Sequence, residues 1–414
     1  MRVNFNKIYL FGLIFSVTIA LTVCISVNAQ PATTPLIKSE TTAIQNLKVF
    51  NALWQRVNSR YFDSNFNGVN WQQIRQIYRP KAERAPNKLA LLVVLKQMLA
   101  ELKTSHLYVW QTVSEKKIES RIRSDFDRKH DTLQFGYGFG FRFIDDRPVV
   151  TELDPNASAK ANGVKTGWTV VAVDNVRVAT RSLDLGDVNE GKKTTFLFSD
   201  PEGKEHLVTL TADWIAKRPV RQSQLLNSTT GYIKFDGFIA GTDNWLRDEM
   251  KKFDSTAAMI VDLRGNRGGY VEEVRNCLAQ FYAANTKLGS FTERNGKSTE
   301  PGVKGKKSKA YNGKIAVLVD EESYSGAEIF AQVIQESGRG RIVGTHTKGE
   351  VLNSMEYGLP SDFRTSIAFR DYRSPKGKRI EGKGVTPDVD VPVTIDDIVR
   401  SHDAALEKAL ETIK

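Results

Sequence analysis

The stretch AAMIVDLRGNRGGYVEEVRNCLAQFY, residues 257–282, decides the fold. AAMIVDL is a nearly continuous apolar run that is typical of a buried strand. RGNRGG is a glycine-rich turn, and the apolar positions that follow it have helical spacing. The same order recurs in KIAVLVDEESYSGAEIFAQVIQESG, residues 314–338, ahead of another apolar run, RIVGT. The repeat predicts an α/β core over residues 213–414, with candidate functional turns at the ends of its strands.

Both turns contain candidates for chemistry. Ser325 opens a helix directly after a strand and a short turn, where its hydroxyl either caps the helix or is an exposed nucleophile next to the free amide of Gly326. Ser323 is the local competitor. The spacing in RGNRGG matches neither a dinucleotide fingerprint nor a P-loop. Gly268 and Gly269 therefore either make a tight turn or direct their amides at a developing oxyanion.

Upstream of the core, residues 131–212 change to short β-like runs separated by turns. Their order predicts β, turn, β, helix, β, and the segment resembles a PDZ domain of exported bacterial proteases. A glycine-rich loop in such a domain binds a peptide C-terminal carboxylate through backbone amides while the peptide adds as a strand. The candidate substrate-binding residues are Gly138, Phe139, Gly140 and Phe141.

A small helical unit is predicted over residues 45–112. Apolar residues recur at intervals of three and four residues from Leu47 to Tyr61 and again from Leu91 to Leu102, which indicates amphipathic helices. The charge-rich residues 113–130 are expected to link this unit to the PDZ-like segment. A hinge there and near 212–230 would permit the PDZ-like segment to gate the active site.

The N-terminus reads as a signal peptide over residues 1–29. Two basic residues precede an apolar run from Ile8 to Val27, and a small-residue site follows at Ala29. The alternative is an uncleaved membrane anchor; either way the bulk of the chain is exported, with residues 30–44 as a linker. The mature chain keeps only Cys277, which excludes an intramolecular disulfide.

Composition excludes several classes of protein. With 414 residues, 40% hydrophobic and 26% charged, the chain is globular rather than disordered. Its formal charge is +11, or +9 without Arg2 and Lys7, but an exported chain with no nucleic-acid-binding motif does not favour a nucleic-acid partner. The basic stretch 297–314 is predicted to be a solvated loop, with contact to anionic polymers as an alternative. No histidine cluster has the spacing of a metal site, so metal-dependent hydrolysis is not expected.

Several separated motifs carry a resemblance to a known family. LKTSHLYVW (102–110), the PDZ-like segment, IVDLRGNRGG (260–269), SGAEIFAQVIQESGRGRIVG (325–344) and IEGKGVTPDVDV (380–391) occur in the order found in the carboxy-terminal processing and tricorn-core family of serine peptidases. The resemblance spans about residues 45–410. It implies a crotonase-like α/β peptidase core with an inserted PDZ-like β-domain, and no metal or organic cofactor.

The family has two catalytic versions. Carboxy-terminal processing proteases use a Ser-Lys dyad, but an ungapped comparison puts Glu350 at the lysine position, and the nearest lysine is Lys348. The tricorn-like version implies Ser325 as nucleophile and His106 as general base, whose ordinary pKa of about 6.5 suits proton exchange. Ser105 and Glu381 would orient and polarise them.

These observations predict an exported, periplasmic or extracellular serine endopeptidase that acts on proteins or peptides, with no stable membrane insertion after signal cleavage. Gly326 with Gly268 or Gly269 would form the oxyanion hole. Two alternatives stay open: a Ser325-Lys348 dyad, and a catalytically silent peptide- or lipid-binding protein. The sequence does not define an oligomeric state.

Overall fold

The structure, a computed structural model, describes residues 34–112, 133–180, 190–216 and 221–414, as well as residues 183, 185 and 188. The predicted signal peptide and the predicted charged linker lie outside the described residues.

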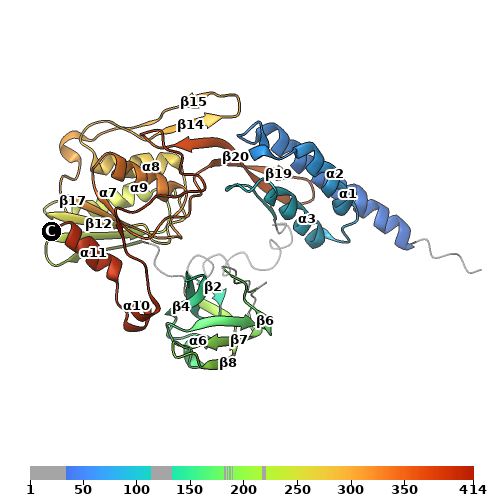
Figure 1. Cartoon of the computed structure of the whole chain (residues 1–414), viewed down its shortest axis with the longest axis horizontal. Coiled ribbons are helices and arrows are strands. Elements are labelled where there is room, and N and C mark those ends of the chain that lie inside the picture. The colour runs from blue at the N-terminus through green and yellow to red at the C-terminus, as the bar shows by residue number, and fades with distance from the viewer. Residues whose placement is uncertain are drawn as a thin grey trace, which may run out of the picture.

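A six-stranded mixed sheet forms the centre of the C-terminal core (Figure 1). Its strands in spatial order are β10 (Arg221–Leu226), β11 (Thr230–Phe235), β12 (Ala258–Asp262), β17 (Lys314–Val319), β18 (Arg341–Gly344) and β21 (Val389–Asp390). β10 pairs antiparallel with β11, and all other neighbours are parallel. The predicted strand, turn and helix units of an α/β core are confirmed.

Helices cover both faces of this sheet because both faces are apolar. Alternate residues of the two central strands, such as Val261 and Val317, share one hydrophobic cluster with helices α7 (Thr242–Lys251), α8 (Val271–Leu278) and α9 (Gly326–Glu336). The intervening residues, such as Ile260 and Leu318, pack instead with α11 (Ala404–Thr412), which follows the short α10 (Ile395–Arg400). β12 and β17 are parallel, so the turns that follow them lie at the same edge of the sheet.

A second sheet joins the N-terminal helices to the core. Its main path runs β1 (Tyr108–Gln111), β20 (Phe363–Arg373), β14 (Ser290–Glu293) and β15 (Ser298–Thr299), and β19 (Asn353–Leu359) also pairs with β20. Helices α1 (Thr34–Arg60), α2 (Trp71–Glu83) and α3 (Lys88–Ala100) share a hydrophobic cluster with residues of β20, including Phe363 and Ile367. The predicted helical unit thus completes its core with a C-terminal strand.

The first helix also begins earlier than expected, at Thr34, inside the segment predicted as a linker. Asn46 is buried and its side-chain amide donates to the carbonyl oxygens of Ala82 and Ala85. This polar contact holds α1 against α2 ahead of the apolar stripe that starts at Leu47.

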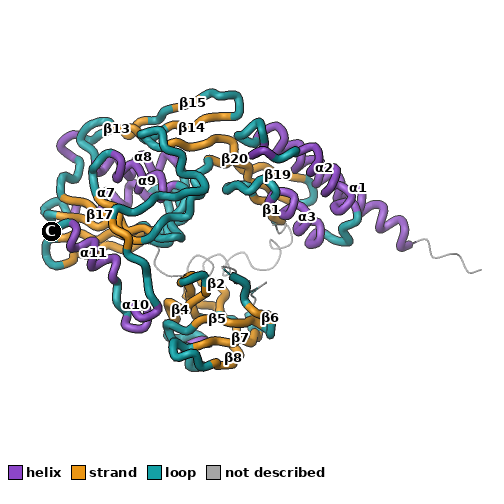
Figure 2. Tube along the Cα trace, viewed as in Figure 1, coloured by secondary structure: helices purple, strands orange, loops and turns teal. Residues whose placement is uncertain are grey.

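The inserted β-domain forms a separate body of strands and loops (Figure 2). Its main sheet runs β3 (Phe139–Ile144), β4 (Arg147–Leu153), β5 (Thr169–Val173), β7 (Lys193–Ser199) and β8 (Glu205–Thr211), with β6 (Val176–Arg177) on β5. α6 (Ser158–Ala161) follows β4, so the predicted order β, turn, β, helix, β is confirmed. β2 (Leu133–Gly136) pairs with β9 (Asp213–Ala216), which carries the domain to residue 216 rather than to the expected 212.

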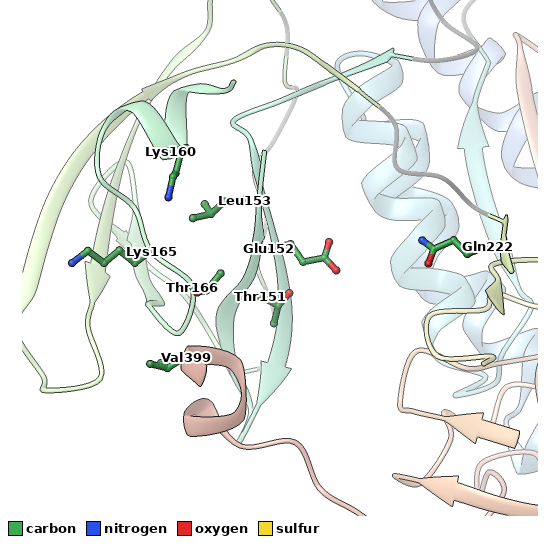
Figure 3. A pocket seen from close by; sticks show the side chains of 8 residues that line it. All are labelled: Thr151, Glu152, Leu153, Lys160, Lys165, Thr166, Gln222 and Val399. Carbon is green, nitrogen blue, oxygen red and sulfur yellow. The ribbon is translucent and has the colours of Figure 1, made fainter. Parts of the chain in front are cut away.

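Among the described residues, contacts at Arg142 and at Gly167 connect the β-domain to the core. The guanidinium of Arg142 on β3 donates to Asp320, directly after β17. On the other side, Val399 of α10 packs against Gly167, where an added Cβ would lie 2.5 Å from its Cγ2. Near that second contact a cavity of about 740 Å³ lies between Lys160 and Lys165 of the β-domain and Val399 of the core (Figure 3). None of the candidate catalytic residues lines it.

The remaining elements are short and lie outside these bodies' main sheets: η1 (Phe66–Gly68), η2 (Ala279–Phe281), β13 (Thr286–Lys287), β16 (Gly302–Val303) and η3 (Lys307–Lys309). The basic stretch 297–314 contains β15, β16 and η3.

Candidate active site

A continuous line of hydrogen bonds joins four of the predicted site residues. His106 Nε2 lies 3.2 Å from Ser325 Oγ, and His106 Nδ1 lies 2.8 Å from Ser105 Oγ. Ser105 Oγ donates to Glu381 Oε2 at 3.0 Å, and the Ser105 amide donates to Glu381 Oε1 at 3.1 Å. Residues separated by 219 and 276 positions in the chain are thus brought into one cluster.

The backbone presents Ser325 in an uncommon conformation. Ser325 is the N-cap residue of α9 and has φ 57° and ψ −118°, a region that serine rarely occupies and that costs free energy of order 1–3 kcal/mol. Two acceptors hold its amide there: the Glu350 carbonyl oxygen at 2.8 Å and Glu328 Oε2 at 3.1 Å. The strain is typical of functional turns, in which the surrounding structure fixes the reacting group.

His106 and Glu381 flank the strands of the sheet that joins the N-terminal helices to the core. His106 lies between α3 and β1, and β1 pairs with β20 in a register that sets Tyr108 opposite Ser366. Glu381 lies in the turn that follows β20 and is buried. The pairing of β1 with β20 therefore brings the N-terminal His106 next to the C-terminal Glu381.

The direction of each hydrogen bond follows from the charge on Glu381. An ionised carboxylate only accepts, so the Ser105 hydroxyl donates to it and has a lone pair left for His106 Nδ1–H. His106 then keeps an unprotonated Nε2, which accepts from the Ser325 hydroxyl. The arrangement favours the tautomer that can remove a proton from Ser325.

Burial shifts the pKa values of this cluster. It is the largest influence on His106 and lowers its pKa, while the charge of Glu350 raises that pKa and the charge of Lys348 lowers it. Burial also raises the pKa of Glu381, against the hydrogen bonds from the amides of Val351 and Ser105. Because the lowered pKa keeps His106 neutral near pH 7, the imidazole is in the form that a general base needs.

The glycines of RGNRGG lie against the start of α9. An added Cβ on Gly268 would lie 2.5 Å from the Gly326 amide nitrogen, so the approach of the two turns requires glycine there. The Gly268 amide donates to Asn266 Oδ1 at 2.9 Å. Within the described part of the chain, the amides of Gly269 and Gly326 have no hydrogen-bond acceptor. The two turns thus offer a pair of amides that remain available to a ligand.

Lys348 does not join the hydrogen-bonded cluster. Its Nζ lies 3.4 Å from Glu350 Oε1 and 4.6 Å from the centre of the Tyr324 ring. These contacts engage the ammonium with a carboxylate and an aromatic face. Ser323 is likewise engaged elsewhere, because its buried hydroxyl donates to the Leu263 carbonyl oxygen at 2.7 Å.

Glu328 is a site residue that the sequence analysis did not select. It is buried at the third position of α9, and its carboxylate accepts from the amides of Ser325, Gly349 and Glu350 and from the Thr347 hydroxyl. Burial raises the pKa of Glu328 to about 7. The pattern Ser-x-x-Glu at a helix start is a capping-box signature that would have indicated the contact to Ser325.

The predicted substrate-binding residues begin the edge strand of the β-domain. Gly138 has φ 86°, and an added Cβ would lie 2.1 Å from the Ala157 Cβ, so only glycine fits. Phe139 packs inward, with its ring 5.5 Å from that of Phe196. Among the described residues β3 pairs with β4 alone, so its other edge has no strand partner.

Two described histidines outside the cluster, His206 and His402, have local partners. His206 contacts Asp200 at 2.8 Å and stacks on Trp168 at 4.2 Å, and His402 contacts Asp397 at 2.7 Å. In the residues that the structure describes, no three His, Cys, Asp or Glu side chains are grouped as a metal site requires. No described helix has the length and apolarity needed to span a membrane.

Comparisons with known proteins place two segments of the chain in described families. The profile of peptidase family S41 matches residues 229–391, and that of the tricorn protease C1 domain matches residues 46–100. The chain is 25% identical to a carboxyl-terminal-processing peptidase 2 from Arabidopsis thaliana, over 94% of this chain and 76% of the relative. It is also 25% identical to a tricorn protease homolog 1 from Streptomyces coelicolor, over 88% of this chain and 34% of that protein.

The fold has a counterpart among solved structures. The photosystem II D1 C-terminal processing protease superposes with a TM-score of 0.59 at 20% identity, and the match covers 87% of this chain and 98% of that one. This likeness concerns the fold. The chain therefore contains a peptidase family S41 domain and a tricorn protease C1 domain, and its relatives include carboxyl-terminal-processing proteases and tricorn protease homologs.

Proposed function

We propose that this protein is an exported serine endopeptidase in which Ser325 is the nucleophile and His106 the general base. The observation that carries the proposal is the hydrogen-bonded line from Ser325 through His106 and Ser105 to Glu381. Nucleophile, base and orienting group are in hydrogen-bond reach of one another, as covalent catalysis by serine requires.

The reaction follows from this order of groups. Ser325 Oγ attacks the peptide carbonyl carbon while its proton passes to His106 Nε2. His106 then gives that proton to the leaving amine, and the carbonyl carbon stays bound to Ser325 as an acyl-enzyme. A water molecule attacks the ester with His106 again as the base, which releases the acid product and restores Ser325.

The oxyanion hole would be formed by the amides of Gly326 and Gly269. Gly326 immediately follows the nucleophile, as in many serine hydrolases. Gly269 is favoured over Gly268 because the Gly268 amide already donates to Asn266, whereas Gly269 is exposed and its amide has no acceptor in the described part of the chain. Two preorganised donors at this position typically stabilise the transition state by several kcal/mol.

We further propose that the β-domain is a PDZ-like module inserted into a crotonase-like core. The free edge of β3 suits addition of a substrate peptide as a further strand. The loop that precedes it, with Gly138 at positive φ, would supply backbone amides to the peptide C-terminus. Substrates would therefore be proteins with an extended C-terminal segment.

Export rests on the N-terminal sequence, in which basic residues precede an apolar run and a small-residue cleavage site. The dyad alternative is less favoured, because the Lys348 ammonium is paired with Glu350 and because an ungapped comparison puts Glu350 at the position of the dyad lysine.

Labelling with a fluorophosphonate probe tests the mechanism. Wild type should be labelled and should hydrolyse an unfolded protein, Ser325→Ala and His106→Ala should lose both activities, and Lys348→Ala should be labelled. His402→Ala is the matched histidine control, because His402 is exposed and lies far along the chain from the cluster. Labelling that survives in His106→Ala but disappears in Lys348→Ala would replace the proposal by the dyad.

A further inference from the structure

Glu350 lies beside the catalytic cluster without being part of the hydrogen-bonded line. Its main chain is clamped to the turn of the nucleophile, because its carbonyl oxygen accepts from the Ser325 amide at 2.8 Å and its amide donates to Glu328 Oε2 at 2.9 Å. Backbone contacts on both sides fix where its side chain starts. The carboxylate therefore has a defined place relative to Ser325.

Side-chain contacts hold that carboxylate beside Tyr108, whose ring neighbours that of His106. The Tyr108 hydroxyl lies 3.4 Å from Glu350 Oε2, and the Tyr108 ring centre is 6.5 Å from that of His106. Lys348 Nζ lies 3.4 Å from the other oxygen, Oε1. Only about a quarter of the Glu350 side chain is exposed, at 24%, so solvent weakens its field less than at an open surface.

The proposed reaction creates a positive charge at this place. When Ser325 loses its proton, His106 becomes an imidazolium. In a Ser-His-Asp triad a carboxylate contacts Nδ1 of the imidazolium directly, but here a neutral hydroxyl, that of Ser105, lies between Nδ1 and Glu381. The line of hydrogen bonds therefore supplies a more distant counter-charge than a direct carboxylate would.

We propose that Glu350 is a second counter-ion for His106, which stabilises the imidazolium formed during attack by Ser325, and that the ion pair with Lys348 limits its strength. Glu350 acts through His106 and is thus a positioning residue rather than a catalytic one. The inference rests on the proposed Ser325-His106 mechanism. It also gives a role to the residue that replaces the lysine of the dyad enzymes.

The other charged or titratable groups around His106 do not supply this field. Tyr108 on β1 has a pKa raised by burial to about 12 and is neutral, and burial likewise raises the pKa of Tyr324, in the turn before α9. Glu381 is reached through Ser105. The charges of Glu350 and Lys348 act on the pKa of His106 in opposite directions, as a carboxylate and an ammonium at this position should.

The test compares the pH dependence of kcat/KM in wild type, Glu350→Gln and Lys348→Met, with a fluorogenic peptide and with the rate of fluorophosphonate labelling. Loss of the carboxylate charge lowers the pKa of His106, so Glu350→Gln should move the acid limb to lower pH by about 0.5–1 unit and reduce the plateau about 5–10-fold. Loss of the ammonium should move the acid limb to higher pH. A purely structural role would change the plateau without moving the limb.

The inference is supported if the acid limb moves to lower pH in Glu350→Gln and to higher pH in Lys348→Met. It is overturned if the acid limb of Glu350→Gln does not move, or if the acid limbs of both variants move in the same direction. In either case the serine mechanism is intact if wild type is still labelled. Absence of labelling in wild type would instead remove the proposed function. If thermal unfolding shows Glu350→Gln to be misfolded, Lys348→Met decides alone, because its side chain is 40% exposed and its limb must move to higher pH.

Discussion

The ion pair between Arg142 and Asp320 connects the β-domain to both active-site turns. Asp320 Oδ1 accepts from the Gly265 amide at 3.0 Å and the Glu322 amide at 3.0 Å, and the Ser323 hydroxyl oxygen lies 3.1 Å from it. The other oxygen, Oδ2, is the acceptor for the Arg142 guanidinium. The Asp320 side chain is only 5% exposed. Loss of Arg142 would leave half of a buried carboxylate without its partner.

We predict that Arg142→Met lowers the rate of fluorophosphonate labelling about 10–100-fold. A hydrogen bond to a buried charged group contributes about 1.5–3 kcal/mol, and each 1.4 kcal/mol corresponds to about a factor of ten in rate. This 10–100-fold loss follows when the Arg142–Asp320 ion pair holds the two turns in the arrangement that reacts with the probe. Asp320→Asn and the double variant complete a double-mutant cycle, whose coupling energy for the labelling rate should be about 1.5–3 kcal/mol.

The matched control is Arg147→Met on the neighbouring strand. Arg147 lies 3.9 Å from Asp145, and the two side chains are 58% and 82% exposed, so this pair contributes little. Wild-type labelling in Arg142→Met, or a coupling energy near zero in the cycle, would refute the reasoning that the β-domain supports the active-site turns.

Three further predictions concern the site and its support. Because burial lowers the pKa of His106, the acid limb of the kcat/KM profile should lie below the ordinary value of about 6.5; activity is lost as pH falls through that limb, and a limb above 6.5 would contradict the assignment. Gly269→Ala should abolish labelling, because an added Cβ would lie 2.2 Å from the Phe238 carbonyl oxygen. Gly265→Ala is the control, because an added Cβ there has nothing within 4 Å. This variant should keep its labelling and lose only about 1 kcal/mol of stability for its positive φ. Arg264→Met should reduce the free energy of unfolding in urea by about 3–5 kcal/mol, because it leaves the fully buried Asp262 with Lys234, 4.0 Å away, as its remaining ion-pair partner; an unchanged urea midpoint would show that the Arg264 pair is dispensable.

The local pattern of apolar residues and glycines was sufficient to predict the strands and helices of the core. The buried run before RGNRGG becomes β12, the run before Ser325 becomes β17, and the helical spacing after each turn becomes α8 and α9. These features depend on neighbours in the chain, since apolar periodicity and glycine turns act over a few residues. The four candidate catalytic residues were selected by resemblance, because a lone histidine or serine carries no local signal of catalysis.

The sequence by itself determined the α/β units, the β-domain and the candidate residues, whereas only the tertiary structure decided which of them meet. Pairing of β1 with β20 brings Ser105 and His106 to Glu381, 276 positions away from Ser105. The tertiary structure also distinguishes residues that the sequence left equivalent. The Gly268 amide donates to Asn266, whereas the Gly269 amide has no acceptor among the described residues. The ammonium of Lys348 pairs with Glu350. The physical reason is that such contacts depend on strand pairing between distant segments, which no local periodicity encodes.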